Sequence, residues 1–219
     1  MNIARLLLAL FIAVPLFADN WIAWRIPTRN NVRVSGRQVC SSGEILLALR
    51  LDKAVIEDVR FFDPVCDPDF DDLKLEMRTM TPEASIDFLV SHLRAADDQD
   101  EVVTAIALHE HEKVVPALIP LARKDPSVQV RRHALFWLGQ KAGQKAAGEL
   151  RRAVDEDPDD DVKEHAVFAI SQLPADRAVP MLIELVKTNK SRKVRERALF
   201  WLSQTGDPRA IDLIEAILQ

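Results

Sequence analysis

Histidine and acidic side chains of the kind that bind metal ions are concentrated in one short stretch of this sequence. The run from His109 to Glu112 alternates His and Glu, and His133 and His165 lie 32 residues apart. Imidazole and carboxylate groups are common ligands of transition metals. A catalytic site would need several of them to converge in one pocket. A metal- or cofactor-handling enzyme is therefore one functional hypothesis for the chain.

A second acidic feature is the tract from Asp63 to Asp72, which contains five Asp. Three of them, at alternate positions from Asp67, have the spacing that opens an EF-hand calcium loop. The required Gly is absent at the sixth position, where Asp72 stands, and Arg78 replaces the closing Glu. We interpret the tract as a solvated loop, with an irregular calcium site as the alternative.

The N-terminus has the layout of a secretory signal peptide. Arg5 is followed by an apolar run from Leu6 to Phe17, and Ala18 precedes polar residues. A run of twelve residues is too short to span the hydrocarbon core, which takes about 20 residues. We predict cleavage after residue 18, a secreted or periplasmic location and no stable membrane insertion after cleavage. The alternative is an uncleaved anchor.

The chain has two cysteines, Cys40 and Cys66, and both follow the predicted leader. An oxidising compartment lets a disulfide persist, so we predict one Cys40–Cys66 disulfide, with two buried thiols as the alternative. Removing residues 1–18 takes away Arg5 and no acid, so the formal charge changes from −5 to −6. An acidic chain does not favour nucleic-acid binding, which relies on clustered Lys and Arg.

The elements that position these residues are set by an ungapped repeat. VRRHALFWLGQ starts at Val130, VKEHAVFAISQ at Val162 and VRERALFWLSQ at Val194, each 32 residues after the last. Such a period is typical of stacked repeats. Each unit has the pattern of two amphipathic helices, neither of which can bury its apolar face alone. With a more degenerate first copy, the predicted repeats are residues 98–124, 126–156, 158–188 and 190–219.

The segment from Trp21 to Thr79 has a different pattern. Large apolar residues alternate with smaller or polar ones in WIAWRI, VRVSGRQV, VIEDVRFF and LKLEMRTM, which predicts strands. SSGEILLALRL is ambiguous between a short helix and a strand. We predict a mainly α fold: an α-solenoid of about four helix pairs over residues 81–219, behind a small β-rich module over residues 19–80 that packs against the first repeat.

Several helix starts are marked by a capping residue followed by Pro. Thr81 with Pro82 starts a helix over TPEASIDFLVSHL. Asp125 and Asp157, each followed by Pro, are predicted to cap first helices, and Asp207 is predicted to cap a second helix. The first of these helices is expected to turn four apolar residues to one face: Ile86, Leu89, Val90 and Leu93.

The repeated unit resembles the HEAT repeat, and most closely the HEAT-like repeats named after phycobilisome lyases. The resemblance rests on the Asp-Pro turn, the Val-Arg or Val-Lys opening and the Ala-rich first helix, over residues 98–219. ALFWLGQ and ALFWLSQ, together with an exported N-terminal module carrying one Cys pair, also resemble secreted bacterial HEAT-repeat proteins. The family resemblance implies an α-solenoid with basic and acidic residues paired along the stack.

The resemblance also implies where an enzyme of this type would bind metal. The di-iron hydroxylase that acts on deoxyhypusine has His-Glu pairs just after the Val of the first helix. The matching positions hold other combinations here: Arg132 with His133, Glu164 with His165, and Glu196 with Arg197. Because none is a His-Glu pair, we predict no metal site, no cofactor and no catalytic residue.

Stacking places equivalent residues in rows along the array. The rows are basic at the start of the first helices, acidic in the turns and amide-bearing at the ends of the first helices. We interpret them as an inter-repeat ladder, with a ligand-binding basic stripe as the alternative. The ladder residues are Asp125, Arg131, Asp157, Lys163, Arg195, Gln140, Gln172 and Gln204.

A row of aromatic residues also recurs: Phe136, Phe168 and Phe200, with Trp137 and Trp201. Rings at helical spacing are usually core, so we expect this row between the layers. Any ring that is exposed would be the best binding hot spot, because Trp and other aromatic anchors dominate many interfaces.

The preferred functional hypothesis is a non-catalytic, protein-binding scaffold in an exported compartment, with a protein partner of unknown identity. Curved stacks present a concave surface, which we expect the second helices to line. A third possibility is that the β-rich module binds the partner and the repeats only hold it. The predicted binding surface on the second helices comprises Arg152, Glu184, Lys187 and Glu215.

Overall fold

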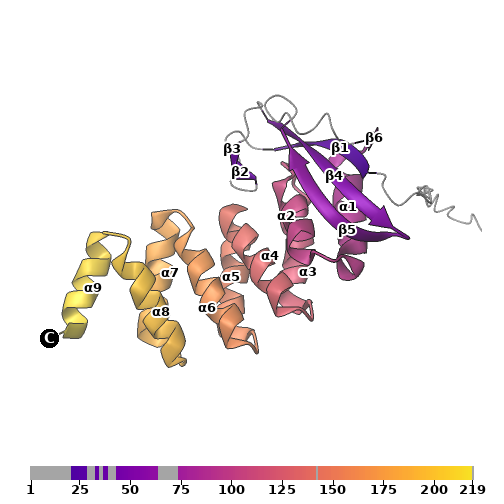
Figure 1. Cartoon of the computed structure of the whole chain (residues 1–219). Coiled ribbons are helices and arrows are strands. Elements are labelled where there is room, and N and C mark those ends of the chain that lie inside the picture. The colour runs from indigo at the N-terminus through magenta and orange to yellow at the C-terminus, as the bar shows by residue number, and fades with distance from the viewer. Residues whose placement is uncertain are drawn as a thin grey trace, which may run out of the picture.

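The computed structural model describes residues 21–28, 33–34, 37–38, 43–63, 74–141 and 143–218. A small β-sheet is followed by helices stacked side by side in pairs (Figure 1). This confirms the predicted fold class, a mainly α solenoid of four helix pairs with a small N-terminal β-rich module. The leader, the Cys40–Cys66 pair and residues 64–72 of the acidic tract lie outside the described residues, so the signal peptide, the disulfide and the calcium alternative stay predictions.

The described part of the module has one four-stranded sheet with the order β5-β4-β1-β6. Strand β1 pairs antiparallel with β4 and parallel with β6, and β4 pairs antiparallel with β5. The bounds are β1 Trp21–Pro27, β4 Glu44–Asp52, β5 Val55–Phe62 and β6 Leu75–Met77, and a separate pair is formed by β2 Arg33–Val34 and β3 Arg37–Gln38.

Strand β4 is the segment whose sequence was ambiguous between helix and strand. It lies in the middle of the sheet and is buried on both faces: Ile45, Leu47 and Leu49 belong to the core shared with the helices, whereas Leu46 and Ala48 belong to a second cluster with Trp21. A strand covered on both faces has no reason to alternate apolar and polar residues, so periodicity alone could not identify it.

Four two-helix repeats follow helix α1 in the described residues, and they stack in chain order (Figure 1). They pair α2 with α3, α4 with α5, α6 with α7 and α8 with α9. The bounds are α1 Pro82–His92, the 3₁₀ turn η2 Leu93–Ala95, α2 Gln99–Leu108, α3 Val114–Lys124, α4 Val128–Lys141, α5 Gln144–Glu156, α6 Asp160–Ser171, α7 Ala175–Thr188, α8 Arg192–Ser203 and α9 Pro208–Leu218.

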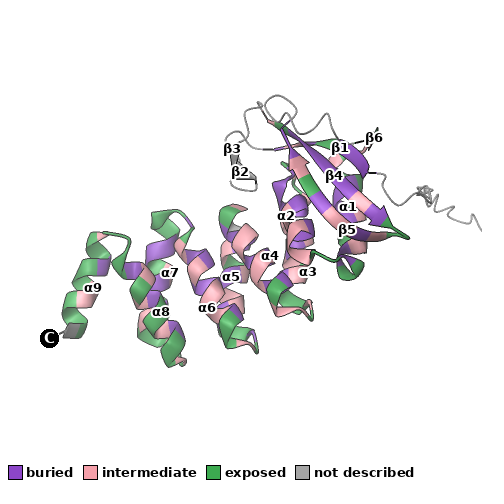
Figure 2. Cartoon of the chain, viewed as in Figure 1, coloured by how far each residue is buried: buried purple, intermediate pink, exposed green. Residues whose placement is uncertain are grey.

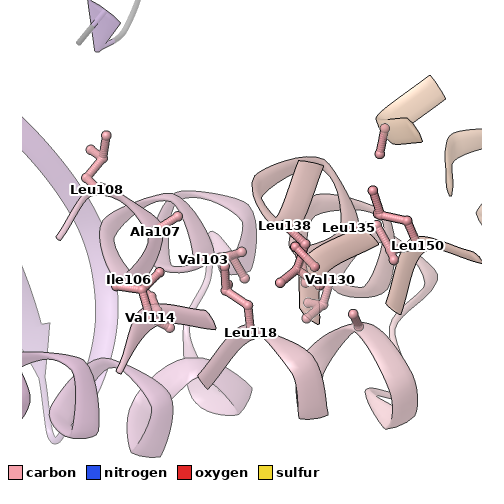
Figure 3. Packing of buried hydrophobic residues seen from close by; sticks show 14 of the residues in the cluster. Val103, Ile106, Ala107, Leu108, Val114, Leu118, Val130, Leu135, Leu138 and Leu150 are labelled. Atoms are coloured by element: carbon pink, nitrogen blue, oxygen red, sulfur yellow. The ribbon is translucent and has the colours of Figure 1, made fainter. Parts of the chain in front are cut away.

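One hydrophobic core runs from the sheet through all four repeats. Figure 2 shows exposed residues gathered at the turns that join the helices and along α9, and buried residues within the helices of the stack. Within the first two repeats, Val103 and Leu118 face Val130 and Leu138 across the repeat boundary (Figure 3). Each helix pair therefore buries its apolar face against the next pair, as the 32-residue pattern requires.

The helix starts agree only partly with the sequence prediction. Thr81 caps α1, with its Oγ1 accepting from the Ala84 N–H at 3.2 Å, and Pro82 is the first helical residue. The assignment of Val90 to the buried face was wrong, because its side chain is 38% exposed while its three predicted companions are buried.

Asp125 and Asp157 are not the caps of the first helices, so this prediction was also wrong. Each accepts the N–H of the residue two places on, within the turn. The N–H groups at the helix start are taken by the next polar residue, Ser127 for α4 and Asp159 for α6. Pro after an Asp therefore marks the turn here. Asp207 does stand directly before α9, where it accepts the Arg209 N–H at 2.9 Å.

The module and the array are joined by a chain of buried hydrogen bonds. Trp24 Nε1 donates to Ser85 Oγ at 2.8 Å, and Ser85 Oγ lies 2.8 Å from His109 Nε2. His109 Nδ1 lies 2.8 Å from the Ala105 carbonyl, which can only accept, so Nδ1 carries the proton. Burial lowers the pKa of His109 to about 4. The neutral ring therefore leaves Nε2 to accept from the Ser85 hydroxyl, and the side-chain polar groups of Trp24, Ser85 and His109 all have partners.

Candidate binding groove on the first helices

The His-Glu run does not form a metal centre. The His109 side chain is fully buried and both its nitrogens are occupied by Ser85 and a backbone carbonyl. His133 Nε2 contacts Thr104 Oγ1 at 3.1 Å. Among the described residues, no three His, Cys, Asp or Glu side chains gather as metal ligands would.

The predicted ladder has one clear rung between repeats. Arg131 makes two hydrogen bonds to the Asp157 carboxylate, at 2.9 and 3.1 Å, and both side chains are buried. Arg131 also donates to the Asp125 carbonyl at 2.9 Å. In the next repeat, Lys163 lies 4.0 Å from Asp160 on its own helix, because Asn189 occupies the position equivalent to Asp157. Arg195 donates to the carbonyl of Asn189, in its own turn.

The amide row does not link the repeats. Gln172 donates to the hydroxyl of Ser171, and Gln204 donates to that of Ser203, each at 3.1 Å within its own chain segment. Gln140 is exposed. The expected inter-repeat hydrogen bonds of this row are thus replaced by contacts at the ends of α6 and α8.

The second helices carry the four residues predicted to bind a partner, but two of these are already paired. Arg152 Nε contacts Glu156 at 2.8 Å, and Glu184 contacts Arg151 at 3.0 Å. Lys187 and Glu215 are exposed. The described surface of these helices is thus partly occupied by local ion pairs, which leaves fewer groups free for a partner.

The aromatic row lies on the first helices and is not fully buried. The rings of Phe136 and Phe168 stack across the α4–α6 boundary with centroids 6.3 Å apart, and the Phe168 and Trp201 centroids lie 5.0 Å apart across the α6–α8 boundary. Phe200 is 49% exposed and meets Trp201 edge to face, with centroids 5.0 Å apart. The interpretation of this row as core is therefore wrong for Phe200.

Beside these rings lies a groove of about 390 Å³ between α4, α6 and α8. Two of its lining residues, Phe168 and Trp201, are aromatic, and the others are charged or polar: Arg132, Asp161, Glu164, His165 and Arg197. The first helices pack directly on one another along the stack, α4 against α6 and α6 against α8, and this packing brings the three helices to one site.

Two features set the charge of the groove. Arg197 is held by Glu164, with contacts of 2.6 and 3.1 Å to one carboxylate oxygen. Burial, followed by the charge of Arg132, lowers the pKa of His165 to about 4, so its imidazole is neutral at pH 7. The His165 ring packs against Phe168 with centroids 5.5 Å apart. The groove thus combines two aromatic rings, a neutral imidazole, the guanidinium of Arg132 and the exposed carboxylate of Asp161.

A scan against known protein families places this geometry in context. The model described as HEAT repeats matches residues 86–171, 115–200 and 149–219, which together span more than half of the chain. The chain belongs to the HEAT-repeat family. Its fold is that of a protein-interaction scaffold, and HEAT repeats commonly mediate protein binding. No curated protein matches the chain. In the described residues of this HEAT-repeat protein, no helix combines the length and apolar character needed to cross a membrane.

Sequence reasoning missed the groove, although it named several of its residues. Arg132, His165 and Arg197 were compared with the metal-binding positions of a related enzyme type and then set aside. A signal was present: residues 33 positions apart in successive first helices face each other, as Glu164 and Arg197 do. Applied along the repeat, this offset brings Arg132 toward His165.

Proposed function

We propose that this HEAT-repeat protein is a non-catalytic scaffold in an exported compartment, and that it binds a protein partner through the first-helix groove. The observation that carries the proposal is an exposed aromatic ring that contacts Trp201, a residue of the groove lining. Phe200 is half exposed beside Trp201. Large aromatic side chains at a surface are the usual anchors of protein interfaces.

The first helices present a better protein-binding surface than the second helices. The aromatic lining residues of the groove offer apolar area to a partner, and the charged lining residues can fix the partner's orientation. Protein-binding sites have this composition. On the second helices, Arg152 and Glu184 are held by neighbours of opposite charge. Binding there would require these ion pairs to be broken or desolvated, a cost that offsets their contribution to affinity.

The exported location rests on the sequence. Residues 1–18 have the charged start, apolar run and small residue of a cleaved leader. The two cysteines that follow fit a compartment where a disulfide persists. Sequencing the N-terminus of the mature protein tests this part: cleavage after Ala18 is expected, and a chain that still begins at Met1 would exclude it.

The binding face is tested by site-specific photocrosslinking in the exported fraction. A photoreactive phenylalanine is placed at Phe200, and in a matched variant at Lys187, which is exposed on the second helix α7. We expect a discrete crosslinked protein from position 200 that is absent from position 187.

Two results would contradict the proposal. A crosslink from position 187 alone would move the site to the second helices. A crosslink that persists at full yield after Trp201→Ala would show that Trp201 does not hold the partner. Deleting residues 19–80 is a further arm, because loss of the crosslink from a folded array would assign binding to the β-rich module.

A further inference from the structure

Side chains on successive first helices form cross-repeat rungs, and two of these rungs pair an acid with a base. Asp100 Oδ1 lies 3.8 Å from His133 Nδ1, between α2 and α4. Glu164 Oε2 lies 2.6 Å from Arg197 Nη2, between α6 and α8. In each rung the second residue comes 33 positions after the first. The acid stands on the earlier helix and the base on the later one.

The middle rung, between α4 and α6, breaks this pattern. Its two positions hold Arg132 and His165, two basic residues, and both line the groove. In the described residues, Arg132 makes one hydrogen bond, from Nη1 to Gln129 Oε1 at 3.1 Å, and no ion pair. Its Nε is buried and has no partner. The middle rung therefore has two nitrogen-bearing groups and lacks the carboxylate found in its neighbours.

The surroundings define what would supply that carboxylate. Glu164 binds Arg197 through Oε2, and among the described residues it makes no ion pair with Arg132. Phe168 and Trp201 add two aromatic rings, in contact with each other, to the groove lining. A ligand that fits must bring an anionic oxygen to Arg132 and an apolar or aromatic side chain to the two rings.

We infer that the groove binds an extended protein segment in which a Glu or Asp side chain lies next to an aromatic residue, with the carboxylate accepting from Arg132 and His165. The neutral His165 donates one N–H, and the guanidinium donates a charge-assisted N–H from one of its terminal nitrogens. Asp161, which is exposed on the groove lining, carries the same charge as the ligand carboxylate and repels it. This inference rests on the proposed function and specifies the chemistry of its partner.

The test is a titration of the full-length protein with two blocked synthetic peptides, one of alternating Phe and Glu and one in which every Glu is replaced by Gln. The readout is the indole N–H resonances of the four tryptophans. We expect a saturable shift of the Trp201 resonance with the Glu peptide, while Trp24, buried at the module junction, does not shift.

Substitutions separate charge from simple packing. Arg132→Gln is expected to lower the affinity for the Glu peptide at least about tenfold and to leave the affinity for the Gln peptide unchanged. Asp161→Asn is expected to tighten the Glu peptide. Arg152→Gln, on the second helices, is the matched control and should change neither peptide. The unshifted Trp24 resonance reports that each variant is folded.

Three outcomes would overturn the inference. Equal binding of the Glu and Gln peptides would show an apolar groove without anion selectivity. Inorganic phosphate alone, if it shifted Trp201 as fully as the peptide, would show a small-anion site. No saturable shift would remove the site for this ligand class. If a partner is still crosslinked from position 200 in any of these cases, the proposed function stands and only the acidic ligand is excluded.

Discussion

Replacing His109 by Gln should remove a pH dependence of stability that the native chain carries. The folded chain lowers the pKa of this imidazole from 6.5 to about 4, chiefly because burial disfavours the charged ring. The unfolded chain therefore binds the proton first as the pH falls. The stabilisation is fully present above about pH 6.5 and is lost as the pH approaches 4.

The size of the effect follows from the shift. A shift of this size corresponds to about 3 kcal/mol of unfolding free energy lost between those two pH values. Gln does not titrate and keeps an acceptor for the Ser85 hydroxyl. The variant is expected to be less stable at pH 7, because the bond to the Ala105 carbonyl is lost, but to lose less stability on acidification.

The assay is urea unfolding followed by circular dichroism at a series of pH values from 7.5 to 4. Carboxylates, His133 and His165 titrate in both proteins, so the difference between the two curves isolates His109. His111→Gln is the control, since that side chain lies two residues on and is only partly buried. Parallel curves for the native chain and His109→Gln would refute the buried hydrogen-bond chain as described.

Three further predictions test the packing of the array and the module, and two of them compare a pair of substitutions. Gly139→Ala should destabilise the protein, because the added Cβ would lie 2.8 Å from a backbone carbonyl oxygen of α6. Gly148→Ala has open space around the added Cβ and should raise the unfolding free energy by about 0.5–1 kcal/mol. Equal effects of the two substitutions in urea unfolding would contradict this prediction. Asp157→Ala should lower the unfolding free energy by about 3–5 kcal/mol, because it leaves the buried Arg131 guanidinium without its partner. Lys163→Ala should change it by no more than about 1 kcal/mol. Thermal unfolding of both variants gives the comparison, and a small loss for Asp157→Ala would refute a stabilising Arg131–Asp157 pair. Ala54→Gly should raise stability by up to about 1 kcal/mol, because this residue of the β4–β5 turn has a φ of 70° that favours Gly, and an unchanged melting temperature would count against that turn geometry.

The helical array could be predicted from the sequence because its pattern is local and repeated. The ungapped 32-residue period and the apolar spacing set the helix pairs, and the Thr81 cap set the start of α1. The turn contacts were harder to predict, since an Asp before Pro can accept either a turn N–H or a helix N–H. Asp157 takes the turn N–H and a buried arginine together, a choice fixed by the neighbouring repeat.

The groove could not be predicted because it depends on how the helices stack. The period gives Phe136, Phe168 and Phe200 one environment, yet only Phe200 is largely exposed, since no further first helix packs beside it within residues 143–218. The placement of Arg132 and His165 in one groove likewise depends on the offset between neighbouring helices. A sequence pattern gives the face of a residue on its own helix, but not which residue of the next helix it meets.

The central claim, that the first-helix groove binds the partner, is tested most directly by affinity. The partner captured by crosslinking is titrated against the native chain, Phe200→Ala and Lys187→Ala. We predict that Phe200→Ala raises Kd at least about tenfold, which corresponds to about 1.4 kcal/mol, while Lys187→Ala leaves Kd within about twofold. An unchanged Kd for Phe200→Ala together with a large increase for Lys187→Ala would contradict the account.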